Sequence, residues 1–97
     1  MAICVLFDFP DGTLEQYDEA CSALNGGQPM RSLSDWPGGG CLAPAAWLTP
    51  EGLRVLDIWE SAEKFSAFGD RLMPIVQEVG LKPNEPEIFQ AHNYVTK

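Results

Sequence analysis

The chain has 97 residues, of which 45% are hydrophobic and 21% are charged. This length suits one domain with one core and leaves no room for a second. Fourteen acidic residues against six basic ones give a formal net charge of -8, which repels phosphate backbones and anionic lipid surfaces. We therefore expect a single domain over residues 1–97, with neither nucleic acid nor a membrane as a partner.

The first seven residues are apolar, but the run is too short for a membrane span and lacks the basic flank of a signal peptide. The cysteines at positions 4, 21 and 41 are odd in number, have no CxxC spacing and lie in apolar surroundings. This pattern is typical of small core residues in a reducing compartment. The sequence therefore predicts a cytoplasmic protein without a cysteine nucleophile.

Residues 2–9 are rich in β-branched, aromatic and aliphatic side chains, which predicts a first strand that ends at the turn residues Pro10, Asp11 and Gly12. Thr13 then fits a helix N-cap, and Gln16 completes a capping box. The helix that follows has an apolar stripe at helical spacing and ends at a run of Asn and two Gly residues. The stripe consists of Leu14, Tyr17, Cys21 and Leu24.

Residues 25–40 form a loop rich in Gly, Pro and Ser, and a loop of this length is unusual in so small a domain. It carries Met30, Leu33 and Trp36, three large apolar residues that a solvated linker does not need. One interpretation is a lid over a cavity. The other is that these three side chains fill a gap in the core or in an interface.

Residues 41–48 predict a second strand, in which Pro44 favours an edge position. A short turn at residues 49–52 leads to a third strand at residues 53–60. Ser61 caps a second helix, in which Pro74 predicts a kink or a break and after which Gly80 ends the element. Its apolar stripe consists of Phe65, Phe68, Leu72, Ile75, Val76 and Val79. Residues 87–95 predict the last strand.

The order is β-α-β-β-α-β, which is the ferredoxin-like arrangement and belongs to the α+β class. In this topology both helices cover one face of the sheet, so the other face should be polar. The predicted strands are instead apolar on both sides: residues 3, 5, 7 and 9 oppose residues 2, 4 and 6, and residues 41, 43, 45 and 47 oppose residues 42, 46 and 48. Because monomers rarely expose such a patch, we expect a homodimer that packs sheet face against sheet face.

The run Asp57, Trp59, Ser61 leads directly into the second helix through Ala62, Glu63, Lys64 and Phe65. It resembles the acid-x-Trp-x-Ser run of the antibiotic biosynthesis monooxygenase (ABM) family, within the dimeric α/β-barrel superfamily. The resemblance in topology covers nearly the whole chain. It implies an antiparallel sheet that pairs into a dimeric barrel. It also implies one of the superfamily's activities, which are cofactor-independent oxygenation of polycyclic aromatics, haem degradation and lactone isomerisation; some members have no assigned activity.

Departures from the superfamily's residue pattern reduce the list of activities that we expect of this chain. Relatives often carry a His on the second helix soon after the cap, and the corresponding segment FSAFGDRL has none. At the positions where haem-degrading members have a Trp and a His, this chain has Phe68 and Glu78, and its first strand lacks their Asn. We therefore expect no haem and no other cofactor. One His and scattered acids also predict no metal site.

Three residues are candidates for catalysis. His92 has an imidazole that suits a general base near neutral pH, and Asn93 beside it could orient a substrate carbonyl. The alternative for His92 is a hydrogen bond at the sheet edge or a dimer contact. Asp57 becomes a useful base if burial raises its pKa, whereas a structural Asp57 would pair with a nearby arginine or a backbone amide. Tyr17 carries a hydroxyl that needs a partner when buried.

Four aromatic residues are candidates for the walls of a flat apolar pocket between sheet and helices, namely Trp59, Phe68, Trp36 and Phe9. The alternative is that they fill the core. With Asn93 they complete the predicted ligand pocket. The sequence thus supports two hypotheses: a homodimeric, cofactor-independent monooxygenase or isomerase that acts on a planar aromatic molecule, or a non-catalytic dimeric module that binds a small ligand or only assembles.

Overall fold

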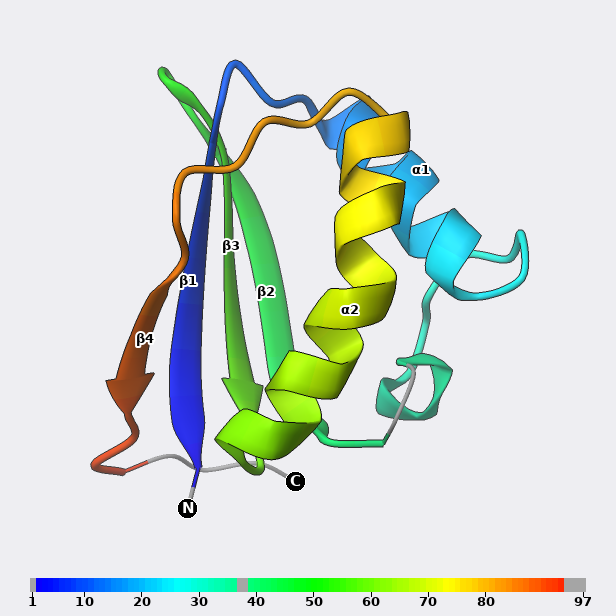
Figure 1. The fold of residues 1–97 in the computed structure, drawn as a ribbon. Coiled ribbons are helices and arrows are strands. Elements are labelled where there is room, and N and C mark those ends of the chain that lie inside the picture. The colour runs from blue at the N-terminus through cyan, green and yellow to red at the C-terminus, as the bar shows by residue number, and fades with distance from the viewer. Residues whose placement is uncertain (1, 37–38, 94–97) are drawn as a thin grey trace.

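The computed structural model describes residues 2–36 and 39–93. The four strands form one sheet in the order β2-β3-β1-β4, and each neighbouring pair is antiparallel. Both helices lie on the same face of this sheet (Figure 1). The predicted α+β fold with β-α-β-β-α-β order is therefore confirmed. The elements are β1 (Ile3–Pro10), α1 (Leu14–Leu24), a 3-10 turn η1 (Leu33–Asp35), β2 (Cys41–Thr49), β3 (Gly52–Trp59), α2 (Ala62–Glu78) and β4 (Glu87–Gln90).

Both helices begin at the predicted caps. The Gln16 backbone N–H donates to Thr13 Oγ1 at 3.1 Å, and the Thr13 N–H donates to Gln16 Oε1 at 3.0 Å, which is a complete capping box. At the start of α2 the Lys64 N–H donates to Ser61 Oγ at 3.2 Å. These side chains satisfy backbone donors that the first helical turn leaves without an internal partner.

One sequence-based boundary was wrong, and one of the two alternatives for α2 is excluded. Pro74 predicted a kink or a break, and α2 runs without a break to Glu78. Pro74 is exposed, so water can satisfy the carbonyl that its missing N–H leaves free. The last strand, predicted over residues 87–95, ends at Gln90, so His92 and Asn93 follow the strand instead of belonging to it. Residue 95 lies outside the described part of the chain.

The core lies between the sheet and the two helices. Alternate residues of the two central strands point toward the helices, because successive side chains of a strand face opposite sides. Trp59, Leu53 and Val5 are completely buried there. The rest of the core from β1, β3 and α2 consists of Ile3, Phe7, Phe9, Val55, Phe68, Leu72 and Val76.

A β-bulge changes the predicted faces of β2. Cys41 pairs with Trp59, whereas Ala43 pairs with Ile58, so one extra residue lies between them. A bulge of this kind shifts the side-chain alternation by one position. Cys41 is consequently buried on the helix-covered side, while Ala43, Ala45 and Trp47 lie on the opposite side. The expectation that Cys41 shares a face with these three was therefore wrong.

The other face of the sheet carries no helix (Figure 1). We call it the open face. Its apolar side chains on the two central strands, Cys4, Leu6, Leu56 and Ile58, are half-buried by their neighbours. Toward the sheet edges Trp47 is 40% exposed and Phe89 is 55% exposed. The open face is thus largely apolar, as the sequence predicted.

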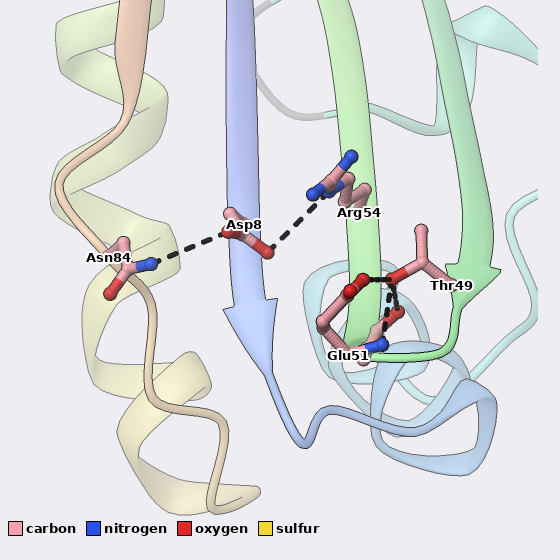
Figure 2. A network of polar contacts seen from close by, with 6 residues as sticks. Asp8, Thr49, Glu51, Arg54 and Asn84 are labelled. Atoms are coloured by element: carbon pink, nitrogen blue, oxygen red, sulfur yellow. Dashed lines mark hydrogen bonds and ion pairs between the residues drawn. The ribbon is translucent and has the colours of Figure 1, made fainter.

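A polar network occupies one end of the open face. Figure 2 shows Asp8 between Arg54 of the neighbouring strand and Asn84 of the segment that precedes β4. Arg54 Nε lies 3.8 Å from Asp8 Oδ1, and Asn84 Nδ2 donates to Asp8 Oδ2 at 3.4 Å. The Asn84 backbone N–H also donates to the Asp8 carbonyl at 2.9 Å. Asp8 therefore links the end of β1 to β3 and to the segment that precedes β4.

The β2–β3 turn depends on Gly52, which has a φ of +140°. A Cβ at this position would collide with the backbone of Phe9 and Asp11. We expect Gly52→Ala to lower the free energy of unfolding by about 2 kcal/mol or more, measured by urea denaturation. Gly69 in α2 is the matched control because a Cβ there meets nothing within 4 Å. Gly69→Ala should raise stability by up to about 1 kcal/mol, and equal losses in both variants would contradict the role of Gly52.

Candidate functional site

Asp57 lies in the middle of β3 and faces the helices. It is 3% exposed and is the only charged residue among the described ones that is buried. Its position follows from the strand alternation, since Val55 and Trp59 on the same side are also buried. Its neighbour across the sheet is Val5, which is completely buried. A carboxyl group is thus held in the apolar core.

The Asp57 carboxyl has one hydrogen bond. Trp59 Nε1 donates to Asp57 Oδ2 at 3.4 Å, whereas Oδ1 is buried and has no partner among the described residues. The indole is held between Phe65, with ring centroids 5.9 Å apart, and Phe68, at 4.7 Å. Neither Arg54 nor Arg71 pairs with Asp57. Arg54 pairs with Asp8 on the open face, and Arg71 on α2 is exposed.

The environment places the titration of Asp57 near neutral pH. Burial raises its pKa from 3.8 to about 7, because the ionised form loses its hydration, and the hydrogen bond from Trp59 opposes this rise. At neutral pH the group therefore exchanges a proton readily. With a free Oδ1, it has the protonation behaviour of a general base.

Tyr17 and Cys21 bring two further polar groups from α1. They are four residues apart and lie on the same side of the helix, which faces Asp57. The Tyr17 hydroxyl and the Cys21 thiol interact with each other, and burial raises the pKa of both groups. Burial likewise raises the pKa of the Cys41 thiol, on β2, to about 12. All three stay protonated at neutral pH, so Asp57 is the group of this cluster that changes charge there.

Asp57, Tyr17 and Cys21 line a small cavity, which we call the inner chamber. Its volume is about 50 Å³, and Asp57, Tyr17 and Cys21 are the polar groups on a wall that is otherwise apolar. An apolar cavity needs roughly 150 Å³ to hold benzene. The inner chamber is therefore smaller than a planar aromatic ligand. Its aromatic wall consists of Phe7, Phe9, Phe68 and Trp36.

A second cavity of about 320 Å³, the outer chamber, adjoins the inner one. Tyr17, Cys21 and Trp36 line both chambers, and Asp18 and Met30 line only the outer one. Trp36 follows η1, and its N–H donates to the Leu33 carbonyl at 3.2 Å. Trp36 is thus one of the three residues that the two chambers share.

The structure brings together most of the residues that the sequence singled out. Asp57 and Tyr17 line the inner chamber, and so do the predicted pocket residues Phe9, Phe68 and Trp36. Trp59 does not line the chamber but holds its carboxyl. The predicted roles of all these residues in binding or catalysis remain predictions.

His92 and Asn93 are not part of this cluster. Both are exposed, follow β4, and line neither chamber in this protomer. Their roles stay predictions without geometric support from one chain. Cys21, in contrast, was interpreted as a core residue, although its spacing of four from Tyr17 places both on one helix face. That spacing was the available signal.

No group of three or more His, Cys, Asp or Glu residues is placed to hold a metal ion in the described part of the chain. Over the same residues, no helix has the length and apolar character needed to cross a membrane. The arrangement that the residues do form is an ionisable carboxyl in an aromatic-walled cavity, beneath two helices on an antiparallel sheet. Such a site suits an enzyme or a binding protein for a small organic molecule.

Comparison with known proteins places this fold. No protein-family model and no curated protein sequence matches the chain. Among solved structures, a candidate monooxygenase from Shewanella loihica PV-4 superposes with a TM-score of 0.58 at 17% identity and covers 96% of each chain. A candidate antibiotic biosynthesis monooxygenase from Chloroflexus aurantiacus J-10-fl gives 0.56 at 15% identity over 100% of both chains.

A third match is SnoaB from Streptomyces nogalater, described as a cofactor-independent oxygenase. A single-residue mutant of SnoaB gives a TM-score of 0.59 at 9% identity and covers 99% of this chain and 97% of its own. The resemblance to ABM-like proteins that the sequence indicated is confirmed at the level of the fold. At these identities the likeness extends to the fold alone.

The raised pKa of Asp57 predicts how stability changes with pH. Between its unfolded value of 3.8 and about 7, the folded chain holds a proton that the unfolded chain releases, so Asp57 lowers stability as pH rises through this window. Three pKa units correspond to about 4 kcal/mol. We expect Asp57→Asn to gain a few kcal/mol over the wild type between pH 4 and pH 8, measured by urea denaturation.

Asp8→Asn is the control for this measurement, since it removes one carboxyl on the open face. The unfolding free energy of Asp8→Asn should not rise above that of the wild type over the same pH range. An Asp57→Asn difference that does not change with pH would show that the carboxyl titrates normally in the folded protein.

Proposed function

We propose that the protein is a cofactor-independent monooxygenase that acts on a planar aromatic molecule between the sheet and the helices. The observation that carries the proposal is the buried Asp57 carboxyl, with Oδ1 unpaired in an aromatic-walled chamber. A pKa near 7 lets this group take a proton from an acidic substrate at physiological pH. The fold resemblance to SnoaB, described as a cofactor-independent oxygenase, supports this chemistry.

The reaction needs only substrate and dioxygen. Asp57 removes a proton from an activated CH₂ group, and the resulting carbanion, delocalised as an enolate, reduces dioxygen and forms a C–O bond to a peroxide. Asp57 returns the proton to the peroxide, which then loses water to leave a ketone. The balance is R₂CH₂ + O₂ → R₂CO + H₂O. The Tyr17 hydroxyl, which lines the same chamber, can donate to the enolate oxygen.

The size of the inner chamber favours a second function. At about 50 Å³ it is smaller than a planar aromatic molecule, so the monooxygenase would need a side chain of the wall to move, such as Trp36, which lines both chambers. A non-catalytic dimeric module that binds a small ligand, or only assembles, would need no such movement. The two functions can be distinguished by oxygen uptake, because only the monooxygenase consumes oxygen.

A panel of anthrones and naphthols tests the enzyme. We expect oxygen uptake with at least one of them, and a loss of about a hundredfold or more in kcat for Asp57→Asn, as is typical for a general base. Tyr17→Phe should lower kcat by a smaller factor, because Asp57 can still remove the proton when the Tyr17 hydroxyl is absent. The measurement is oxygen-electrode kinetics together with product mass spectrometry.

His92→Ala serves as the comparison in these assays. His92 is exposed and lines neither chamber in one protomer, so an unchanged kcat would remove it from the mechanism. Unchanged rates in Asp57→Asn would dismiss the proposed base. Ligand binding by mass spectrometry without oxygen uptake for any compound of the panel would favour the non-catalytic module.

We further propose a homodimer through the open face. Leu6, Leu56 and Ile58 lie at its centre with Trp47 and Phe89 beside them, and burying apolar area contributes about 25 cal/mol per Å². A stable interface buries roughly 800 Å² on each partner.

The three cysteines are free, which supports the cytoplasmic location that the sequence predicted.

A charge at the centre of the open face tests the dimer. We expect the wild type to have twice the chain mass of 10.7 kDa by size-exclusion chromatography with light scattering, and Leu56→Arg to be monomeric. Ala67→Arg, on the exposed side of α2, is the matched control and should remain dimeric. A monomeric wild type would refute the interface.

A further inference from the structure

The two chambers contain no positive charge. Two acidic residues line them, Asp57 in the inner chamber and Asp18 in the outer one, and no Lys, Arg or His of the described residues lines either. Arg54 is paired with Asp8 on the open face, and Lys64 is paired with Glu60 at the start of α2. An anionic ligand would therefore meet only acidic side chains.

The chambers also contain one buried hydrogen-bond acceptor that has no partner in the described part of the chain. The Tyr17 hydroxyl and the Cys21 thiol interact with each other. Asp57 Oδ1, in contrast, is a buried acceptor that has no hydrogen-bond partner among the described residues. A buried acceptor without a partner lowers stability, more so when it is charged, and a ligand that donates to it recovers that loss.

From these two observations we propose that the joined chambers select an aromatic molecule that carries a hydroxyl or amine donor and no carboxylate or other negative charge. The donor binds Asp57 Oδ1, and the ring packs against Phe68 on the inner wall. The inference rests on the site of the proposed oxygenase and names the charge class of its substrate. It concerns binding alone, so it can be tested without turnover.

The two kinds of donor differ in how their binding depends on pH. An ammonium group needs the ionised Asp57, so its affinity should rise with pH up to about 7 and its binding should release a proton below that. A hydroxyl binds with little change in protonation. The groups that face Asp57 are Trp59 on its own strand, Tyr17 and Cys21 from α1, and Cys41 from β2; the last three stay neutral over this range.

Four probes of one shape test the proposal, namely benzyl alcohol, benzylamine, benzoate and toluene, titrated into the full chain at pH 7.5 and followed by two-dimensional amide NMR. We expect the alcohol and the amine to shift resonances of Tyr17, Cys21 and Asp57 and to bind at least tenfold more tightly than benzoate. Toluene should bind more weakly than the alcohol. Benzoate binding as tightly as the alcohol, or no shift with either donor, would overturn the proposal.

Two variants separate the carboxyl from general charge effects. Asp57→Leu keeps an apolar core and should bind toluene and benzyl alcohol equally, with no preference for benzylamine. Asp8→Asn removes the same charge from the open face and should keep the wild-type order of the four probes. A wild-type order in Asp57→Leu would overturn the assignment to Asp57.

The outcome is independent of the test of the proposed function. Selective binding of the two donors without oxygen uptake from any anthrone or naphthol would leave this inference standing and remove the oxygenase. Oxygen uptake together with tight benzoate binding would support the oxygenase and overturn this inference.

Discussion

The burial of the Asp57 carboxyl within the apolar core is the constraint on which the rest of the site depends. It leaves one oxygen bonded to Trp59 and the other unpaired, and it moves the pKa into the physiological range. The core tolerates this cost because the indole donor is fixed between two phenylalanine rings. Native proteins usually satisfy such groups, and the exceptions are common at functional sites.

The rest of the molecule positions this carboxyl. The central strand β3 fixes its depth, α1 places Tyr17 and Cys21 opposite it, and the segment after η1 places Trp36 on the wall of both chambers. The same strand presents Leu56 and Ile58 to the open face. One strand therefore connects the proposed chemistry with the proposed dimer.

The fold was largely predictable from local patterns. Capping residues, apolar stripes and turn signals act over a few residues, and they placed six elements in the correct order. The errors arose where tertiary surroundings decide: the β2 bulge moves Cys41 to the helix side, and β4 ends before His92. Periodicity alone cannot show a bulge or the point at which a strand loses its partner.

The sequence by itself determined the class of fold, the two apolar faces of the sheet and the aromatic composition of the site, because these follow from residue spacing and hydrophobicity. Only the tertiary structure decided that Asp57 faces the helices, bonds Trp59 and shares a chamber with Tyr17, whereas His92 does not. The physical reason is that a carboxylate acquires its pKa and its partners from residues distant in the chain. These include Trp36 from the long loop and Tyr17 from α1, which folding alone brings to the same cavity.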